Sequence, residues 1–343
     1  MITPDTDEQF MRLAIDLGFH GLGMTSPNPA VGAIVVREGV VIGEGWHKKA
    51  GGPHAEVHAI RDAHEKHGPE STRGATIYVT LEPCSTHGRT PPCTSAIQDA
   101  GISRVVVGST DPNPDHVGGG FDLLRTAGIE VVTGIAEKEA DHLLRFFRKH
   151  ITTGRPWVIG KTAATLSGHT TLPQGEGQWI SSPASREDVQ RIRRQCDAIL
   201  IGGETFRIDN PSLTLRGKWA EGRDQPRRIV LSSDSQLVQT HHLFTDEFRD
   251  RTTVHAGVTL LESLTQLGAE GVTSVLLESG GRLLAHALEE GLIDELVLYL
   301  APIIGGGGSK TIPVQDFAAR LDDVDVTMSG PDIRIIGYPA CLS

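Results

Sequence analysis

The chain has 343 residues, of which 38% are hydrophobic and 22% are charged. This length suits about two domains, and the composition is typical of a globular protein. There is no run of about 18 apolar residues that would span a membrane, and the acidic N-terminus lacks a secretory signal. A net charge of -11 argues against general nucleic-acid binding, which depends on a basic surface. We therefore expect a cytoplasmic protein with no nucleic-acid or membrane partner.

The first half of the chain alternates helical and strand patterns. Apolar residues at helical spacing predict helices, and short β-branched runs between turn residues predict strands. The predicted helices are 10–17, 54–64, 93–100 and 137–150, and the predicted strands are 31–36, 40–43, 75–80, 105–107 and 130–132. Such alternation predicts a layered α/β domain.

The pattern breaks at residues 152–156, which read Thr-Thr-Gly-Arg-Pro. We place a domain boundary there, with one domain at 1–152 and a second at 153–343. The second domain alternates again, which predicts another α/β unit. Its predicted strands are 157–161, 198–202, 228–232, 272–277 and 295–300, and its predicted helices are 183–196 and 281–290.

The strongest chemical signal is the triplet His54-Ala55-Glu56, followed by Pro83-Cys84 and by Cys93. One imidazole and two thiolates supply three zinc ligands and leave a fourth position for water, which is the open geometry of a catalytic site. Glu56 would face the same cavity and move a proton from that water to a departing amine. The pattern resembles the zinc-deaminase signature H-x-E and P-C-x-x-C, with eight residues rather than two between the cysteines.

A closed structural zinc site is the main alternative to this interpretation. It would need a fourth protein ligand, for which His47 or His87 could be proposed. The Pro-Cys pair, the glutamate and their placement on a helix together favour the catalytic site. We interpret the other two cysteines, Cys196 and Cys341, as core or tail residues without a site role.

Further motifs in the first half resemble the bifunctional deaminase/reductase family of bacterial riboflavin biosynthesis. They are the segments 27–32, 45–47, 53–56, 81–84, 88–93 and 111–114. The resemblance implies a three-layer cytidine-deaminase-like domain with zinc as cofactor. It also implies a substrate pocket lined by Asn28, His47, Arg89, Asp111 and Asn113. Without the resemblance, Asn28 and Asp111 could as well be turn residues, because each precedes a proline.

The second half resembles the reductase domain of the same family, an α/β domain with a fold like dihydrofolate reductase. The matching segments are 161–163, 178–181, 209–216, 278–281 and 294–302, together with Arg193. The resemblance implies NADPH-dependent reduction of a ribose to a ribityl chain. The residues that would then face the substrate are Lys161, Ser181, Arg193, Asp209, Arg216 and Glu278.

Chemical roles can be suggested for several of these residues. Asp209 and Lys161 are the candidate proton or charge partners for hydride transfer, so we count them as catalytic with Glu56. Arg193 and Arg216 could pair with a 5′-phosphate. Cofactor contacts are expected from Trp179 and from Gly280-Gly281, because backbone N–H groups at the start of a helix suit a phosphate.

Four positions depart from the family pattern in the second half: Ser167, Gly177, Ser232 and Gln236. Two hypotheses follow. The chain is either a bifunctional enzyme acting on a phosphorylated diamino-ribosylaminopyrimidine, or a deaminase whose degenerate reductase domain is a scaffold. A nucleic-acid base deaminase or a zinc-stabilised binding module is disfavoured by the acidic charge. Ser232 and Gln236 predict a reduced preference for NADPH over NADH. We also expect a homo-oligomer.

Overall fold

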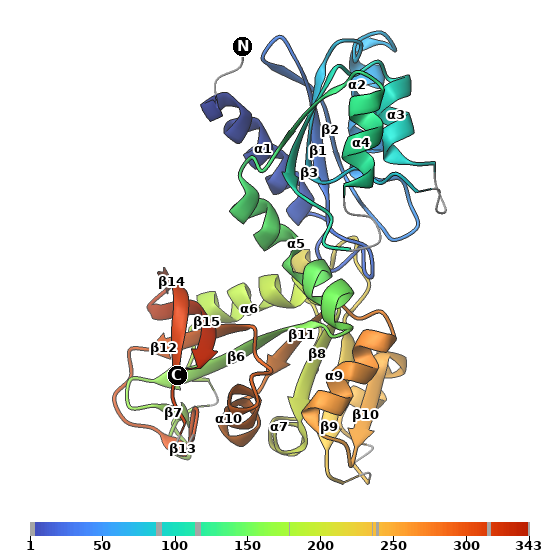
Figure 1. The fold of residues 1–343 in the computed structure, drawn as a ribbon. Coiled ribbons are helices and arrows are strands. Elements are labelled where there is room, and N and C mark those ends of the chain that lie inside the picture. The colour runs from blue at the N-terminus through green and yellow to red at the C-terminus, as the bar shows by residue number, and fades with distance from the viewer. Residues whose placement is uncertain are drawn as a thin grey trace. The chain divides into compact units, whose positions relative to one another are not determined.

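The computed structural model describes residues 4–86, 91–113, 118–177, 179–234, 236–237, 240–313 and 317–341. The chain forms two compact units, Met1–Gly154 and Arg155–Ser343 (Figure 1). Helix α5 (Glu137–Thr153) ends the first unit, three residues later than the predicted end of this helix. Gly154 follows it in the left-handed conformation, which is the usual way for a glycine to end a helix.

The first unit is built on a five-stranded sheet in the order β2-β1-β3-β4-β5. The first three strands are antiparallel, whereas β3, β4 and β5 are parallel. Glu38 and Gly39 both have positive φ and form the tight turn between β1 and β2 that the sequence predicts. The strands are β1 (Gly32–Arg37), β2 (Val40–Trp46), β3 (Thr76–Leu81), β4 (Arg104–Ser109) and β5 (Glu130–Thr133).

Helices cover both faces of this sheet and make the three layers that the resemblance implies. One layer holds α1 and α5, and the other holds α2, α3 and α4 (Figure 1). Helix α4 is not among the predicted elements, because it has only eight residues and opens with glycines. The other helices of this unit are α1 (Pro4–Phe19), α2 (Ala55–His67), α3 (Cys93–Asp99) and, for α4, Gly119–Thr126.

Helix α2 packs directly on the edge strand β2. A Cβ atom at Gly43 or Gly45 would lie 2.2 Å or 2.4 Å from backbone atoms of Ala59, so only glycine fits at these two positions. The helix buries Ala55, Ala59 and Ala63 in the core. This close approach sets where the first turn of α2 lies relative to the carboxyl end of the sheet.

The second unit has an eight-stranded sheet in the order β10-β9-β8-β11-β6-β12-β15-β14. The strands from β10 to β12 are parallel, and β15 and β14 add an antiparallel edge. A small second sheet pairs β13 with β7. The strands are β6 (Trp157–Thr165), β7 (His169–Thr171), β8 (Ala198–Gly202), β9 (Arg227–Ser232), β10 (Thr252–Ala256), β11 (Ser274–Glu278), β12 (Glu295–Ala301), β13 (Gly307–Lys310), β14 (Ala319–Ser329) and β15 (Asp332–Cys341).

The two faces of this sheet carry different helices. Val275 and Leu277 of β11 share a core with Leu264 of α9 and Leu284 of α10. Successive strand residues point to opposite faces, so Glu278 points to the other face, where it meets α6. The helices are α6 (Pro183–Gln195), α7 (Gly203–Asp209), α8 (His242–Thr245), α9 (Leu260–Ala269) and α10 (Gly281–Glu289), with 3-10 turns η1 (Gly217–Ala220) and η2 (Arg249–Arg251).

We expect residues 1–154 to fold without the second unit. Helix α5 belongs to the first unit, since Leu143 and Leu144 are each only 1% exposed and Leu144 lies in its core. Burial of each leucine contributes about 1.5–3 kcal/mol, a large part of the stability of a small domain. Urea unfolding followed by circular dichroism should show a cooperative transition for fragment 1–154 and none for fragment 1–136, which lacks α5. A fragment 1–136 as stable as 1–154 would show that α5 is dispensable.

Candidate active sites

Three elements bring one imidazole and two thiols together at the carboxyl end of β3. His54 is the residue before α2, Cys84 lies in the loop after β3, and Cys93 is the first residue of α3. Nδ1 of His54 lies 3.1 Å from Sγ of Cys93 and 3.6 Å from Sγ of Cys84. The three ligand atoms all lie within 4.8 Å of one another. This donor set and spacing fit zinc, with Nδ1 as the histidine ligand.

The hydrogen bonds of the site prepare Cys84 to act as a thiolate. The hydrogen bond with Cys93 lowers the pKa of Cys84 more than burial raises it, and His54 lowers this pKa further. The backbone N–H of Cys93 also donates to Sγ of Cys84, at 3.3 Å. The hydrogen bond with Cys84 in turn raises the pKa of His54. Because zinc binds thiolate rather than thiol, this pattern suits Cys84 as a metal ligand. The hydrogen bond between Cys84 and Cys93, together with burial, raises the pKa of Cys93, so a bound metal would have to displace the proton of that thiol.

Glu56 lies on the first turn of α2 and is only 3% exposed. Burial raises the pKa of its carboxyl group. Its side chain contacts the thiol of Cys93, yet the cluster of metal-ligand atoms found among the described residues is His54, Cys84 and Cys93. Glu56 therefore lies beside the cluster and outside it, and its predicted role in proton transfer stays a prediction.

His47 and Asn28 form a pair next to the ligand His54. Nδ1 of His47 donates to the carbonyl of Pro53, at 2.9 Å, and Nε2 accepts from the side-chain amide of Asn28, at 3.2 Å. Burial lowers the pKa of His47, which favours the neutral ring that this arrangement requires. Its ring packs edge-on against that of His54, with centroids 5.3 Å apart. Both nitrogens of His47 are thus occupied, which argues against His47 as a fourth zinc ligand.

The loop after β4 carries two further predicted pocket residues. The backbone N–H of Asn113 donates to Oδ1 of Asp111, at 2.8 Å, so Asp111 does shape a turn, as its position before a proline also suggested. Arg89 and His87, the other proposed ligand, lie outside the described residues. The motif that contains Cys84 also contains Glu82, to which the sequence analysis gives no role. Glu82 is 5% exposed, and its carboxylate accepts hydrogen bonds from this loop.

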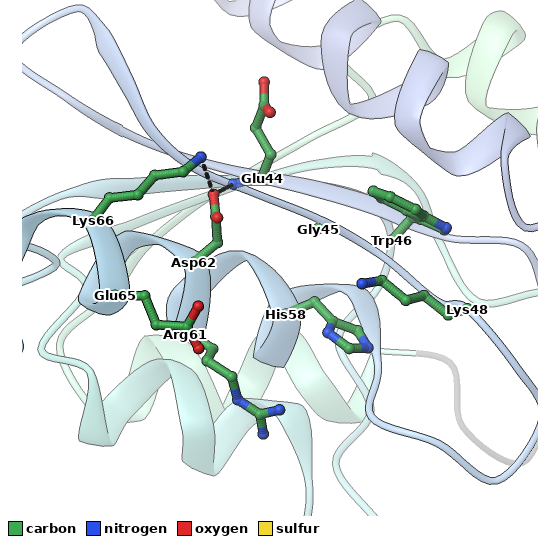
Figure 2. Close-up of a pocket in the computed structure, with 9 residues that line it drawn as sticks. All are labelled: Glu44, Gly45, Trp46, Lys48, His58, Arg61, Asp62, Glu65 and Lys66. Atoms are coloured by element: carbon green, nitrogen blue, oxygen red, sulfur yellow. Dashed lines mark hydrogen bonds and ion pairs between the residues drawn. The ribbon is translucent and has the colours of Figure 1, made fainter.

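A cavity of about 350 Å³ lies between β2 and α2 (Figure 2). It holds none of the predicted site residues. Three of its side chains are basic and three are acidic, and Lys66 and Asp62 form an ion pair across 2.7 Å. We therefore do not assign it to the metal centre. Its lining residues are Glu44, Gly45, Trp46, Lys48, His58, Arg61, Asp62, Glu65 and Lys66.

In the second unit, three charged side chains meet on the face that α6 covers. Glu278, the last residue of β11, is the register partner of Lys161 in the middle of the parallel strand β6. Arg193 of α6 binds Glu278 with two hydrogen bonds, from Nε at 2.5 Å and from Nη2 at 2.9 Å. A third bond joins Nη1 to the carbonyl of Thr214, at 2.9 Å. The structure thus brings together Lys161, Arg193 and Glu278.

The contacts of Arg193 bear on its expected role. It is only 9% exposed, and each of its three nitrogens already has a protein partner. Two of its five N–H groups bind and orient Glu278, and a third binds the carbonyl of Thr214. The predicted phosphate contact would use the remaining N–H groups and stays a prediction. Nothing local in the sequence reveals that β11 passes beside α6. Arg216, by contrast, is exposed, and its charge acts on Glu278.

Burial and charge act in opposite directions on this cluster. Burial raises the pKa of Glu278, but the charge of Arg193 and its hydrogen bonds lower it more, so Glu278 stays ionised. Burial lowers the pKa of Lys161, which Glu278 partly offsets. An ammonium group whose pKa is lowered gives up its proton more readily than an exposed lysine.

The remaining predicted residues of the second unit are not hydrogen-bonded to this cluster in the part of the chain that the structure describes. Asp209 ends α7 and is exposed, and no hydrogen bond joins it to Lys161, although the structure describes both. Trp179 is 60% exposed, with the guanidinium of Arg186 5.5 Å from its ring centroid. The carbonyl of Ser181 accepts a hydrogen bond from the same Arg186, at 2.5 Å.

Gly280 and Gly281 open α10 after β11, as predicted: Gly280 is the N-cap and Gly281 is the first residue of the helix. Gly281 has φ of +58°, a conformation that favours glycine. Its N–H already donates to the carbonyl of Thr311, at 2.9 Å, so it is not open to a cofactor phosphate. A Cβ at Gly280 would lie 3.2 Å from the side chain of Thr170, which explains the small residue there.

Two of the departures from the family pattern have structural roles. The hydroxyl of Ser167 accepts from the N–H of Gly305, at 2.9 Å, and that of Ser232 accepts from the N–H of Asp234, at 3.1 Å. Both serines therefore shape loops through one hydrogen bond each. Gln236 is exposed, and Gly177 has φ of +118°.

Comparisons with known proteins identify a family for each of the two units. Residues 4–109 match the cytidine and deoxycytidylate deaminase zinc-binding region, and residues 156–335 match the RibD C-terminal domain. The riboflavin biosynthesis protein RibD of Escherichia coli (strain K12) is 38% identical, with 98% of each chain covered. RibD of Actinobacillus pleuropneumoniae is 39% identical, over 97% of this chain and 93% of that protein.

Solved structures give the same result. RibD of Acinetobacter baumannii superposes with a TM-score of 0.86 at 36% identity, covering 98% of this chain and all of that one (100%). A diaminohydroxyphosphoribosylaminopyrimidine deaminase/5-amino-6-(5-phosphoribosylamino)uracil reductase from Thermotoga maritima has a TM-score of 0.85 at 34% identity, with 98% and 99% covered. Relatives that match nearly the full length of the chain thus cover both units. The chain belongs to the RibD family of bifunctional deaminase/reductases of riboflavin biosynthesis.

Proposed function

We propose that this chain catalyses two successive reactions on one small phosphorylated pyrimidine. The first unit deaminates 2,5-diamino-6-ribosylamino-4(3H)-pyrimidinone 5′-phosphate by hydrolysis, and the second reduces the ribose of the product to a ribityl chain with NADPH. The single observation that carries the proposal is the convergence of His54, Cys84 and Cys93 with the buried Glu56 beside them.

The first reaction needs an activated water and a group that moves its proton. Zinc, when bound, supplies the Lewis acid that makes the water acidic near neutral pH. The three protein ligands leave a fourth position for that water. Glu56 takes the proton there and delivers it to the departing amine, a role that suits a carboxyl group whose pKa burial has raised. His54 and the two thiolates only hold the metal.

The pocket residues of the first unit have complementary hydrogen-bonding groups. The amide of Asn28 donates to neutral His47 and keeps its oxygen for a ring N–H of the substrate. We propose that Asp111 and Asn113 approach the same substrate from the loop after β4. We propose that Arg89 binds its phosphate or a carbonyl with its planar fork.

In the second reaction, the cluster on the α6 face binds and orients the sugar. NADPH, when bound, supplies the hydride. Lys161 is placed to hold or give a proton beside the ionised Glu278, whereas Arg193 fixes the orientation of Glu278. We propose that exposed Arg216 contacts the 5′-phosphate, that Ser181 and Asp209 contact the substrate, and that Trp179 and the Gly280 turn contact the cofactor. This complete charge cluster favours a working reductase over a scaffold.

We also propose that the protein is a cytoplasmic homo-oligomer. None of the helices that the structure describes is long and apolar enough to cross a membrane. Strand β14 forms one edge of the eight-stranded sheet and exposes Val324, Val326 and Met328 by 50%, 59% and 66%. An edge strand with apolar side chains is suited to pairing with another chain. Fragment 1–154 lacks β14, so it should sediment as a monomer, whereas the intact chain sediments as a dimer or larger.

Replacing Glu56 with glutamine should separate proton transfer from metal binding. The amide keeps the shape of the side chain but cannot take up the water's proton, so deamination should fall by at least about a hundredfold. Zinc, measured by atomic emission, should stay near one per chain, because no ligand has changed. The matched variant Cys84→Ala should lose both zinc and deamination. A zinc-free Glu56→Gln protein would show that Glu56 belongs to the ligand set.

Mass spectrometry of the intact reaction should resolve the two steps. Incubation with the diamino substrate alone should raise its mass by roughly one unit, as an amino group is exchanged for oxygen. Added NADPH should raise it by about two more through hydride and proton transfer. Asp209→Asn should slow only the second step if Asp209 contacts the substrate. Deamination without any consumption of NADPH or NADH would establish the scaffold hypothesis instead.

A further inference from the structure

We propose that Glu82 is a positioning residue for deamination, which holds the loop bearing Asp111 and Asn113 at the metal centre and thereby sets substrate affinity. The proposal rests on the proposed function, since it assumes that this loop contacts the substrate. Glu82 is not part of the cluster of zinc-ligand atoms found among the described residues. It acts through the backbone of the loop.

The carboxylate of Glu82 accepts three backbone hydrogen bonds from segments that lie far along the chain. Oε2 accepts from the N–H of Asp111 at 3.4 Å and from that of Gly118 at 3.1 Å. Oε1 accepts from the N–H of Gly120, at 3.1 Å. All three are donors from the peptide backbone rather than from a cationic side chain. With 5% exposure, the side chain of Glu82 takes these N–H groups as hydrogen-bond partners in place of water.

The segment that carries Glu82 also carries a zinc ligand. Glu82 is followed by Pro83 and Cys84, and its own N–H donates to the carbonyl of Ser109 at the end of β4, at 2.9 Å. A Cβ at Gly120 would lie 2.2 Å from the carbonyl oxygen of Pro83. The start of α4 therefore rests directly on the segment 82–84. Glu82 fastens the turn formed by Asp111 to the same short segment that fixes Cys84.

An amide in place of this carboxylate tests the idea with no change of size. Glutamine offers one acceptor oxygen and one NH₂ donor, whereas the loop presents only donors to the two carboxylate oxygens. Whichever way the amide is turned, its NH₂ group faces at least one N–H. The loop should loosen, while the three zinc ligands and Glu56 keep their places.

The test is steady-state deamination by intact, zinc-loaded Glu82→Gln protein. We expect KM for the diamino substrate to rise about tenfold or more, with kcat within about threefold of the wild type. Zinc content and NADPH-dependent reduction of the deaminated substrate should be unchanged. Hydrogen exchange should be faster at the amides of Gly118 and Gly120. Glu65→Gln, an exposed glutamate on α2 of the same unit, is the matched control and should behave as the wild type.

The possible results distinguish a failure of this proposal from a failure of the proposed function. A wild-type protein that does not deaminate refutes the function. An active wild type with an unchanged KM and unchanged exchange in Glu82→Gln overturns only the role of Glu82, as does loss of zinc or a fall in kcat alone. If Glu82→Gln is insoluble, Gly120→Ala tests the same contact by pushing α4 off Pro83. A raised KM with zinc retained supports the proposal, and an unchanged KM overturns it.

Discussion

The convergence of His54, Cys84 and Cys93 on one point is the constraint on which the first unit depends. Each ligand comes from a different element, and all three atoms lie within 4.8 Å of one another. The packing of α2 on β2 contributes to this geometry, because Gly43 and Gly45 let the helix lie directly against the strand. Three protein ligands would leave a bound zinc one position for water. The same packing places Glu56, on the first turn of α2, in contact with Cys93.

The second unit is constrained by a different feature, the burial of charged side chains against its sheet. Glu278 and Lys161 lie side by side on two parallel strands, and burial alone would favour the neutral form of both. The bidentate contact of Arg193 keeps Glu278 ionised. A charge paired in this way costs less to bury than an isolated one, and removal of one partner is typically destabilising. The cluster thus serves the site more than the stability of the fold.

Much of the secondary structure could be predicted from the sequence, because it depends on residues that are close together in the chain. The β1–β2 turn, helix α2 and the order of zinc ligands depend on short spacings that one segment displays. Helix α9 was missed although Thr259 and Glu262 form a capping box that the sequence shows. Helix α4 lacks such a signal, because Glu82 from another strand end satisfies its first N–H groups. The hairpin of β14 and β15 was also missed, although Val324, Val326 and Met328 alternate with polar residues along β14.

The site residues divide in the same way. A recognisable pattern of residue types reveals His54, Glu56, Cys84 and Cys93, whereas the partner of Arg193 depends on how α6 packs against β11.

The central claim is that the metal has three protein ligands and an open fourth position. X-ray absorption at the zinc edge of the intact protein tests it most directly. The account predicts two sulfur atoms at about 2.3 Å and two lighter atoms at about 2.0–2.1 Å, with a single imidazole. A second imidazole or a third sulfur would contradict it.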